Sequence, residues 1–287
     1  DLLDLPRDAV MPPVSASEIL KARLNGITFN IIDWIGNVLV FLFIAGIILG
    51  ILRLLFIGAL AIIQWSRCRL GKDYCNFPDK SVRKVSIIVP AYNEEKVILK
   101  TIDSLLKSDH SYFEIIAVDD GSQDATLQLL RENYSENNKV KIFSIPNSGK
   151  ANALNYGIER SDAEIIITLD ADTIFAPDTT SKLARRFVNP EVSAVAGNAK
   201  VGNRMNLLTR WQALEYITSQ NLDRRAFDIL NCITVVPGAV GAWRRKSIIE
   251  AGGFSPLTLA EDTDLTFAII RNGHKVQYED EALAYTE

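Results

Sequence analysis

The chain has 287 residues, with 31 Lys and Arg against 35 Asp and Glu, so it is long enough for one large domain or two ordinary ones. The slightly acidic balance argues against a nucleic-acid-binding protein, which is usually basic. The three cysteines have neither the spacing of a zinc site nor the even number of a disulfide framework, and they favour a reducing compartment for the main domain.

One long apolar stretch lies within the first 84 residues. We expect residues 1–33 to be a linker and juxtamembrane tail, in which a short helix from Glu18 could lie on the membrane surface. Residues 34–65 carry a single charge and are long enough to cross a bilayer, as one tilted helix or with a re-entrant second part. A buried core helix is the weaker alternative, because no polar residues set one face apart from another. Residues 66–84 form a basic linker, and the positive-inside rule places this side in the cytoplasm.

From Val85 onward, short apolar runs alternate with segments of helical periodicity. The expected strands cover residues 85–89, 113–118, 140–145 and 164–169, and the expected helices cover residues 94–107, 124–134, 151–160 and 177–188. This alternation predicts an α/β fold with a mainly parallel sheet and helices on both faces. Further along, we expect strands at residues 192–199 and 233–243, a long amphipathic helix at 207–227, and helices near 246–251 and 261–271.

The run at residues 164–169 leads directly to Asp170 and Asp172. Its β-branched residues indicate a strand buried on both faces, and in open α/β sheets ligands bind beyond the carboxyl ends of the strands. Two carboxylates without a neighbouring Cys or His suit Mg²⁺ or Mn²⁺ better than zinc. An Asp-x-Asp triplet alone is weak evidence, since residues 262–264 form a second one. The prediction of a metal–diphosphate site therefore rests on the position of Asp170 and Asp172 at the end of a strand.

Two other strand ends carry polar residues that could reach the same crevice. Pro90 ends the first strand and Tyr92 could stack on a base, although an ordinary turn would explain both. Asp119 and Asp120 precede a glycine turn. Two adjacent carboxylates are costly unless they meet donors or cations, which favours a ligand over a simple helix cap.

Two helix starts offer further charged groups. Lys150 follows a glycine turn without the full P-loop spacing, so it either contacts a diphosphate or is solvated. Glu261 and Asp262 open a helix, where a carboxylate is often only a cap. In a transferase, the same group could take the proton from an attacking hydroxyl.

Five motifs in order resemble the family 2 glycosyltransferases with the GT-A fold. They are residues 89–94 (VPAYNE), 118–122 (VDDGS), 148–155 (SGKANALN), 169–172 (LDAD) and 260–262 (AED). Each is weak alone, but five in this order are highly specific. Residues 237–245 also resemble a segment of the membrane synthases of hyaluronan, chitin, cellulose and poly-N-acetylglucosamine, and the poly-N-acetylglucosamine and chitin-like group is the most similar.

The resemblance implies a Rossmann-like GT-A domain over residues 85–287 that transfers a sugar from a UDP-sugar to a growing β-linked polysaccharide, with inversion. It implies nucleotide-sugar contacts for Pro90, Tyr92, Glu94, Asp120, Lys150 and Asp170. Asp172, with Asp170, would bind Mg²⁺ or Mn²⁺ together with the diphosphate, and Asp262 would be the general base. Gly238, Trp243, Arg244 and Glu261 would lie on the acceptor side.

The resemblance also implies a place and partners. We expect an inner or plasma membrane protein with a cytoplasmic catalytic domain, in contact with the lipid bilayer, a polysaccharide acceptor, and a fused or associated deacetylase and export machinery. UDP-N-acetylglucosamine is the preferred donor. A UDP-glucose-using β-glucan synthase and a non-catalytic nucleotide-sugar-binding subunit are the alternatives. The Gln-x-x-Arg-Trp motif of processive members does not occur before Glu287, so we expect the domain to be truncated at its C-terminus.

Overall fold

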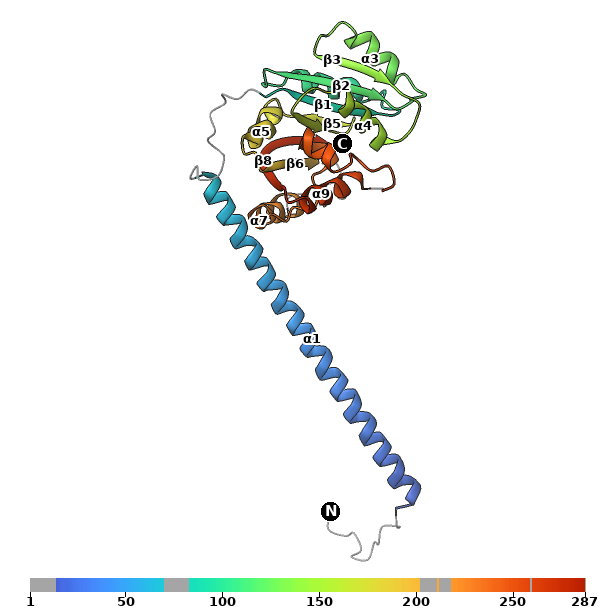
Figure 1. Cartoon of the computed structure of the whole chain (residues 1–287). Helices are drawn as coiled ribbons and strands as arrows, with labels where there is room; N and C mark the ends of the chain where they lie inside the picture. Colours follow the sequence, from blue (N-terminus) through green and yellow to red (C-terminus); the bar gives the residue numbers. More distant parts are fainter. Residues whose placement is uncertain (1–13, 70–82, 202–210, 212–217, 259, 287) are drawn as a thin grey trace, which may run out of the picture. The chain divides into compact units, whose positions relative to one another are not determined.

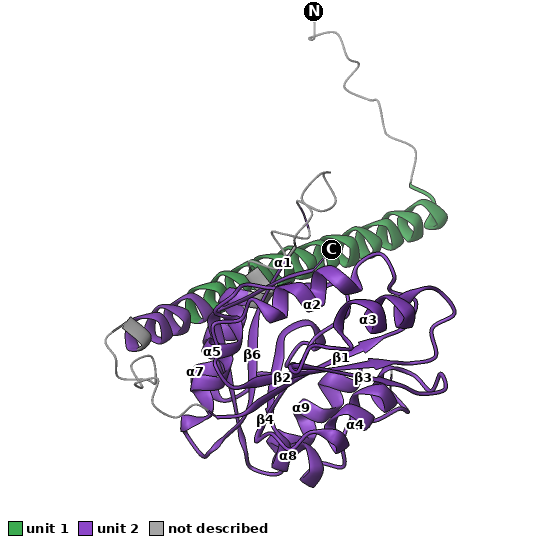
Figure 2. Ribbon diagram, turned by 90° about the horizontal axis from the view of Figure 1, so that it is seen from above, with its two compact units in different colours: residues 1–56 green, residues 57–287 purple. Residues whose placement is uncertain are grey.

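The computed structural model describes residues 14–69, 83–201, 211, 218–258 and 260–286. The chain divides into two compact units, residues 1–56 and residues 57–287 (Figure 2). The first unit consists, in its described part, of the greater length of one helix. The second contains a sheet with its covering helices and the last turns of that helix.

Helix α1, Ala16–Arg69, is continuous (Figure 1). The sequence suggested a separate short helix from Glu18, but no proline interrupts these residues and the two segments join. The N-cap of α1 is Ser15. The Ser15 Oγ accepts the Glu18 N–H at 3.3 Å, and Glu18 Oε2 accepts the Ser15 N–H at 2.9 Å, which is a capping box.

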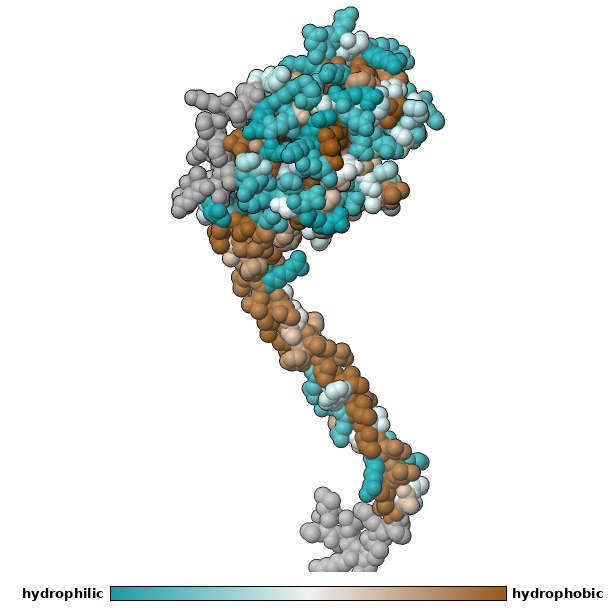
Figure 3. Space-filling model, viewed as in Figure 1, coloured by the Kyte–Doolittle hydropathy of each residue, from teal (hydrophilic) through white to brown (hydrophobic). Residues whose placement is uncertain are grey.

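Residues 16–67 of α1 have the length and composition of a membrane-crossing helix, with a mean hydropathy of 2.8 and no burial in the most apolar window. Phe41 and Phe43 are 69% and 71% exposed, and the face visible in Figure 3 is predominantly hydrophobic. Such exposure does not fit the core helix of a globular domain. At 1.5 Å per residue, residues 34–52 are about 28 Å long, close to the thickness of a bilayer core.

Eight strands form one sheet in the order β3-β2-β1-β4-β7-β6-β8-β5. They are β1 Val85–Ala91, β2 Phe113–Asp119, β3 Val140–Ser144, β4 Ile165–Thr168, β5 Thr173–Phe175, β6 Val192–Val201, β7 Gly241–Arg244 and β8 Lys275–Thr286. Strands β1 to β4 pair in parallel, as do β6 and β8, whereas β7 is antiparallel to both of its neighbours and β5 is antiparallel to β8. The prediction of a mainly parallel sheet is confirmed.

Helices cover both faces of this sheet, as predicted. Alternate residues of β1 face opposite sides: Ile87 packs in one core cluster and Ile88 in the other. The first cluster receives side chains from α2 Ile98–Leu106, α3 Thr126–Tyr134 and α5 Thr179–Arg185, and the second from α4 Lys150–Arg160, α8 Arg245–Glu250 and α9 Glu261–Arg271. Burial on both faces explains why the central strands are predominantly apolar.

The expected strand at residues 233–243 forms only over β7. Pro237 has no backbone N–H to give to a ladder, and the chain makes a short 3₁₀ turn, η3 Gly238–Val240, before the strand begins. In the antiparallel register, Gly241 lies opposite Thr168 and Arg244 lies opposite Ile165. Residues just before β7 therefore lie at the carboxyl end of β4, and Arg244 lies at the other end.

The remaining elements are short or were not expected. The 3₁₀ turn η1 Arg186–Val188 follows α5, and the π-helical turn η2 Thr218–Asp223 precedes α7 Arg224–Leu230. Of the amphipathic helix expected at residues 207–227, residues 207–210 and 212–217 lie outside the described residues, and residues 218–227 are helical in η2 and α7. Strands β5 and β8 were not predicted from the sequence.

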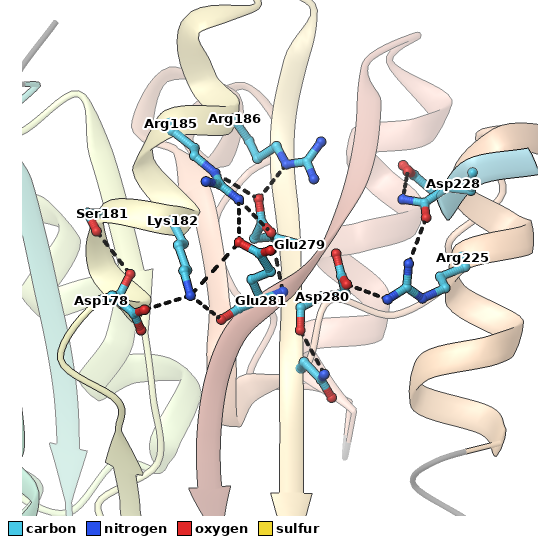
Figure 4. A network of polar contacts seen from close by, with 12 residues as sticks. Asp178, Ser181, Lys182, Arg185, Arg186, Arg225, Asp228, Glu279, Asp280 and Glu281 are labelled. Atoms are coloured by element: carbon cyan, nitrogen blue, oxygen red, sulfur yellow. Dashed lines mark hydrogen bonds and ion pairs between the residues drawn. The ribbon is translucent and has the colours of Figure 1, made fainter. Parts of the chain in front are cut away.

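Strand β8 is held by ion pairs with α5, η1 and α7 (Figure 4). Glu279 is fully buried, with its oxygens 2.7 Å from Arg186 Nε and 3.0 Å from an Arg185 nitrogen. Asp280 pairs with Arg225, and Glu281 pairs with Arg185 at 3.2 Å. Three consecutive acidic residues can therefore lie inside a strand, because each has a basic partner.

Candidate active site

A pocket of about 520 Å³ lies at the carboxyl ends of β1, β2 and β4. Its lining comprises Pro90, Ala91, Tyr92, Glu94, Asp120, Asn147, Gly149, Lys150, Asp170, Ala171 and Asp172. The structure thus brings together every residue to which the sequence assigned a nucleotide-sugar or metal contact. Tyr92 is 44% exposed, so part of its side chain is accessible to a ligand.

Asn93 ties the loop after β1 to the loop after β2. Its side-chain oxygen accepts the Gln123 N–H at 2.8 Å, and its own N–H donates to Ser122 Oγ at 3.0 Å. The backbone φ of Asn93 is 57°, which Asn tolerates better than most residues. Sequence reasoning gave this residue no role, although an Asn between two pocket residues was a usable signal for a turn.

Asp120 holds a second loop of the pocket in place. It is 4% exposed, and its two oxygens accept the backbone N–H groups of Ser148 and Gly149, each at 2.8 Å. Gly121, with φ 72°, allows this approach, because a Cβ there would lie 2.7 Å from the Asn147 nitrogen. The donors that two adjacent carboxylates require therefore come in part from the protein itself. The role of Asn147 and Gly149 as pocket walls was missed.

Lys150 bridges two carboxylates from different elements. Its Nζ lies 2.6 Å from Asp170 Oδ1, beyond β4, and 3.1 Å from Glu261 Oε1, at the start of α9. Burial lowers the pKa of the Lys150 ammonium, but the two carboxylates outweigh burial and the pKa lies above its usual value. The site therefore contains a firmly protonated cation. Glu261, for which the resemblance implied an acceptor-side place, contacts this pocket residue.

Asp262 lies at the first turn of α9, next to the pocket. Its Oδ2 accepts the Gly238 N–H at 3.1 Å, and its Oδ1 accepts the Thr263 N–H at 2.7 Å. A Cβ on Gly238 would lie 3.0 Å from Lys150 Nζ and 3.6 Å from Asp170 Oδ1. Gly238 thus connects Asp262 with the Lys150–Asp170 pair.

The structure does not bring Trp243 and Arg244 to this site, which corrects the acceptor-side position expected for them. Trp243 is fully buried, donates from Nε1 to Thr168 Oγ1 at 3.1 Å, and packs edge to face on Phe254 at 5.8 Å. Arg244 lies at the opposite end of β7 and pairs with Glu164. The antiparallel direction of β7, which sequence periodicity does not reveal, accounts for the difference.

We expect Arg244→Met to lower stability without changing substrate affinity. Arg244 donates to the backbone oxygens of Val192, Phe187 and Asn189 at 3.1–3.2 Å, and their loss should cost about 1–3 kcal/mol of unfolding free energy. Thermal unfolding and the KM for donor and acceptor test this, with the exposed Lys246→Gln as control. A raised KM at unchanged stability would restore the acceptor-side role.

Glu94 lies in an excess of negative charge. Burial raises the pKa of its carboxyl above the ordinary value of 4.5, and neighbouring carboxylates, Asp172 first among them, raise it further. Ionised Glu94 therefore opposes folding of the unliganded protein at neutral pH, and this penalty disappears as the pH falls below the ordinary pKa and both states take up the proton.

We accordingly expect Glu94→Gln to raise the unfolding temperature of the unliganded protein at pH 7, by about 2 °C. The difference should vanish as the pH falls below 4.5, the ordinary pKa of the Glu94 carboxyl. Thermal unfolding across pH measures it, with Glu95→Gln as the neighbouring control. An equal gain at low pH would contradict an electrostatic cause.

The donor set fits a divalent cation only in part. Among the described residues, no group of three or more Asp, Glu, His or Cys side chains could hold a metal ion. Asp170 and Asp172 supply two carboxylates, and Mg²⁺ is commonly held by one or two carboxylates together with substrate phosphates. The residues therefore suit a cation whose coordination is completed by a diphosphate, and not one held by the protein alone.

Comparison with known proteins agrees with this geometry. Residues 86–253 match the family described as glycosyl transferase family 2. The chain belongs to this family. It is 28% identical over 208 residues to a poly-beta-1,6-N-acetyl-D-glucosamine synthase of Staphylococcus epidermidis, covering 72% of this chain and 50% of that protein. A synthase of the same name from Staphylococcus aureus strain COL is 26% identical over 202 residues, covering 70% and 49%. This family 2 chain spans about half the length of these curated relatives.

Solved glycosyltransferase structures share the fold. The mannosyltransferase PcManGT from Pyrobaculum calidifontis, in complex with GDP-Man and Mn²⁺, superposes with a TM-score of 0.62 at 22% identity, covering 80% of this chain and 68% of that one. TarS 1-349 of S. aureus, in complex with UDP-GlcNAc, gives 0.55 at 23% identity, covering 71% and 58%. At these identities the likeness establishes the GT-A fold of the family 2 chain.

Proposed function

We propose that this chain is the catalytic part of a membrane glycosyltransferase that transfers N-acetylglucosamine from UDP-N-acetylglucosamine to a growing β-linked polysaccharide, with inversion. The observation that carries the proposal is the position of Asp262, joined through Gly238 to the Lys150–Asp170 pair at the pocket. A carboxylate beside a pocket that contains a lysine ammonium suits a general base next to a departing diphosphate. The names of the curated relatives support the sugar and the polymer.

Each pocket residue has a proposed role that follows from the chemistry of its side chain. Tyr92 offers an exposed ring for stacking on uracil, and Asp120, whose oxygens keep lone pairs beyond the two loop hydrogen bonds, accepts from the base. Lys150 offsets the charge of the diphosphate. Asp170 and Asp172 would hold Mg²⁺ or Mn²⁺, which as a Lewis acid stabilises the charge developing on the leaving group. Asp262 takes the proton from the acceptor hydroxyl as it attacks the anomeric carbon.

We also propose that α1 anchors the protein in the inner or plasma membrane, with residues 66–287 in the cytoplasm. The unburied apolar helix and the basic residues that follow it support this orientation. The polysaccharide, an export machinery and a deacetylase are then the partners to be sought.

The deciding experiment incubates membranes that contain the full-length protein with several UDP-sugars, followed by digestion of the product with linkage-specific glycosidases. We expect incorporation from UDP-N-acetylglucosamine into a β-linked polymer. Incorporation from UDP-glucose alone would identify a β-glucan synthase. Binding of UDP without any incorporation would identify a nucleotide-sugar-binding subunit.

A further inference from the structure

Lys150 is a cation held inside the proposed diphosphate site before any ligand binds. It is the first residue of α4, where the helix dipole disfavours a positive charge. Its position is stabilised by Asp170 at 2.6 Å and Glu261 at 3.1 Å. Gly238 leaves the space for this arrangement, because a Cβ there would lie 3.0 Å from Lys150 Nζ.

The Lys150 ammonium contacts an Asp170 oxygen that a metal ion would need as a ligand. Asp170 is one of the two carboxylates proposed to hold the cation, and its Oδ1 already contacts Lys150. A divalent ion on the same carboxylate would lie within a few ångströms of a like charge, which is strongly unfavourable in a partly desolvated site. Without Lys150, the carboxylates of Glu94, Asp170 and Asp172 along this wall would present three uncompensated negative groups.

We propose that Lys150 is a built-in counter-ion that keeps free divalent cations off Asp170 until a nucleotide diphosphate binds. The diphosphate offers oxygens of higher charge density, so the ammonium leaves Asp170 for the phosphate and keeps its contact with Glu261. The freed carboxylate and the phosphate then bind the metal together. This inference rests on the proposed function, and it makes nucleotide and metal binding cooperative.

Thermodynamic linkage between UDP and Mn²⁺ defines the quantity to be measured, which is the factor by which each ligand tightens binding of the other. A ligand can shift the Lys150 equilibrium only by its differential affinity for the two positions of the side chain, and the coupling acts equally in both directions. UDP should therefore tighten Mn²⁺ binding by the same factor by which Mn²⁺ tightens UDP binding. Typical couplings correspond to roughly 5- to 150-fold.

The test measures Mn²⁺ binding to the full chain in detergent by the loss of the electron paramagnetic resonance signal of free Mn²⁺, with and without UDP. For the wild-type protein we expect weak binding of Mn²⁺ alone and tighter binding with UDP. Lys150→Gln should bind Mn²⁺ alone roughly 5- to 150-fold more tightly and lose most of the coupling. Lys150→Arg, which keeps the charge, should behave like the wild type.

Lys246→Gln is the matched control, since it removes one positive charge from an 81% exposed side chain outside the pocket. Circular dichroism and thermal unfolding establish that each variant is folded. Coupled binding in the wild type that Lys150→Gln leaves unchanged would overturn this inference alone. Failure of the wild-type protein to bind Mn²⁺ even with UDP would overturn the metal-dependent function and the inference with it.

Discussion

Asp262→Asn is expected to lower the rate of sugar transfer by about 10²- to 10⁴-fold, the contribution of a positioned general base, and to leave UDP affinity unchanged. Asn has nearly the shape of Asp, but it does not accept a proton from the acceptor hydroxyl. Asp262 is not among the residues that line the nucleotide pocket, so donor binding does not depend on its charge directly. The rate should fall in kcat more than in the KM for the donor.

The local structure limits the side effects of this substitution. The Thr263 hydroxyl donates to Asp262 Oδ1 at 3.3 Å. In addition, each Asp262 oxygen accepts one backbone N–H donor, from Gly238 and from Thr263. The amide of Asn satisfies only one of these two donors in either orientation, which should cost about 1 kcal/mol. The thermal unfolding temperature must therefore be measured beside the rate, so that loss of folded protein is not read as loss of catalysis.

Asp264→Asn is the matched control. It removes a carboxylate from the same first turn of α9, but the side chain is exposed. Transfer by this variant should remain near the wild-type rate. Unchanged turnover of Asp262→Asn in the same assay would eliminate Asp262 as the base, and equal losses in both variants would indicate an effect of helix charge instead.

Much of the pocket could be predicted from the sequence, because the carboxyl ends of parallel strands meet at one edge of a sheet. Asp120 and Asp170 each follow a strong apolar run, so their convergence required only the order of elements. Glu94 and Lys150 lie at turns next to such runs. The geometric rule worked for Asp120 and Asp170 because β1, β2 and β4 are all parallel, whereas the contact of Glu94 was implied by the resemblance to family 2 glycosyltransferases.

The rule that parallel strand ends meet at one edge did not predict positions in the antiparallel part of the sheet. The resemblance to family 2 glycosyltransferases implied a place near the acceptor for Trp243 and Arg244, yet both lie on β7, which runs away from the pocket. Strand direction depends on long-range pairing, which local periodicity does not contain. Strand β8 also depends on long-range pairing and was not predicted, because the acidic residues 279–281 have the composition of an exposed loop. Their basic partners lie some hundred positions earlier or on another helix.

The second prediction with a large expected effect concerns strand β8. Glu279→Gln should lower the free energy of unfolding by about 3–5 kcal/mol, because it removes the carboxylate that pairs with the buried Arg186. Arg186 is 2% exposed and Glu279 is fully buried, with Nε and Oε2 2.7 Å apart. Burial lowers the pKa of the Arg186 guanidinium, but Glu279, with smaller contributions from Asp228 and Asp280, raises it by more in sum, so the pKa lies above its ordinary value and the charge is retained.

The measurement is thermal unfolding of the detergent-solubilised chain, where we expect a decrease of about 10 °C. Glu281→Gln is the control on the same strand: Glu281 shares Arg185 with Glu279, but its side chain is 58% exposed, so its loss should cost at most about 1 kcal/mol. Equal effects of the two variants would mean that the number of ion pairs, and not their burial, holds β8 to α5. Transfer activity of Glu279→Gln should persist below its unfolding temperature, because neither Glu279 nor its arginine partners line the pocket.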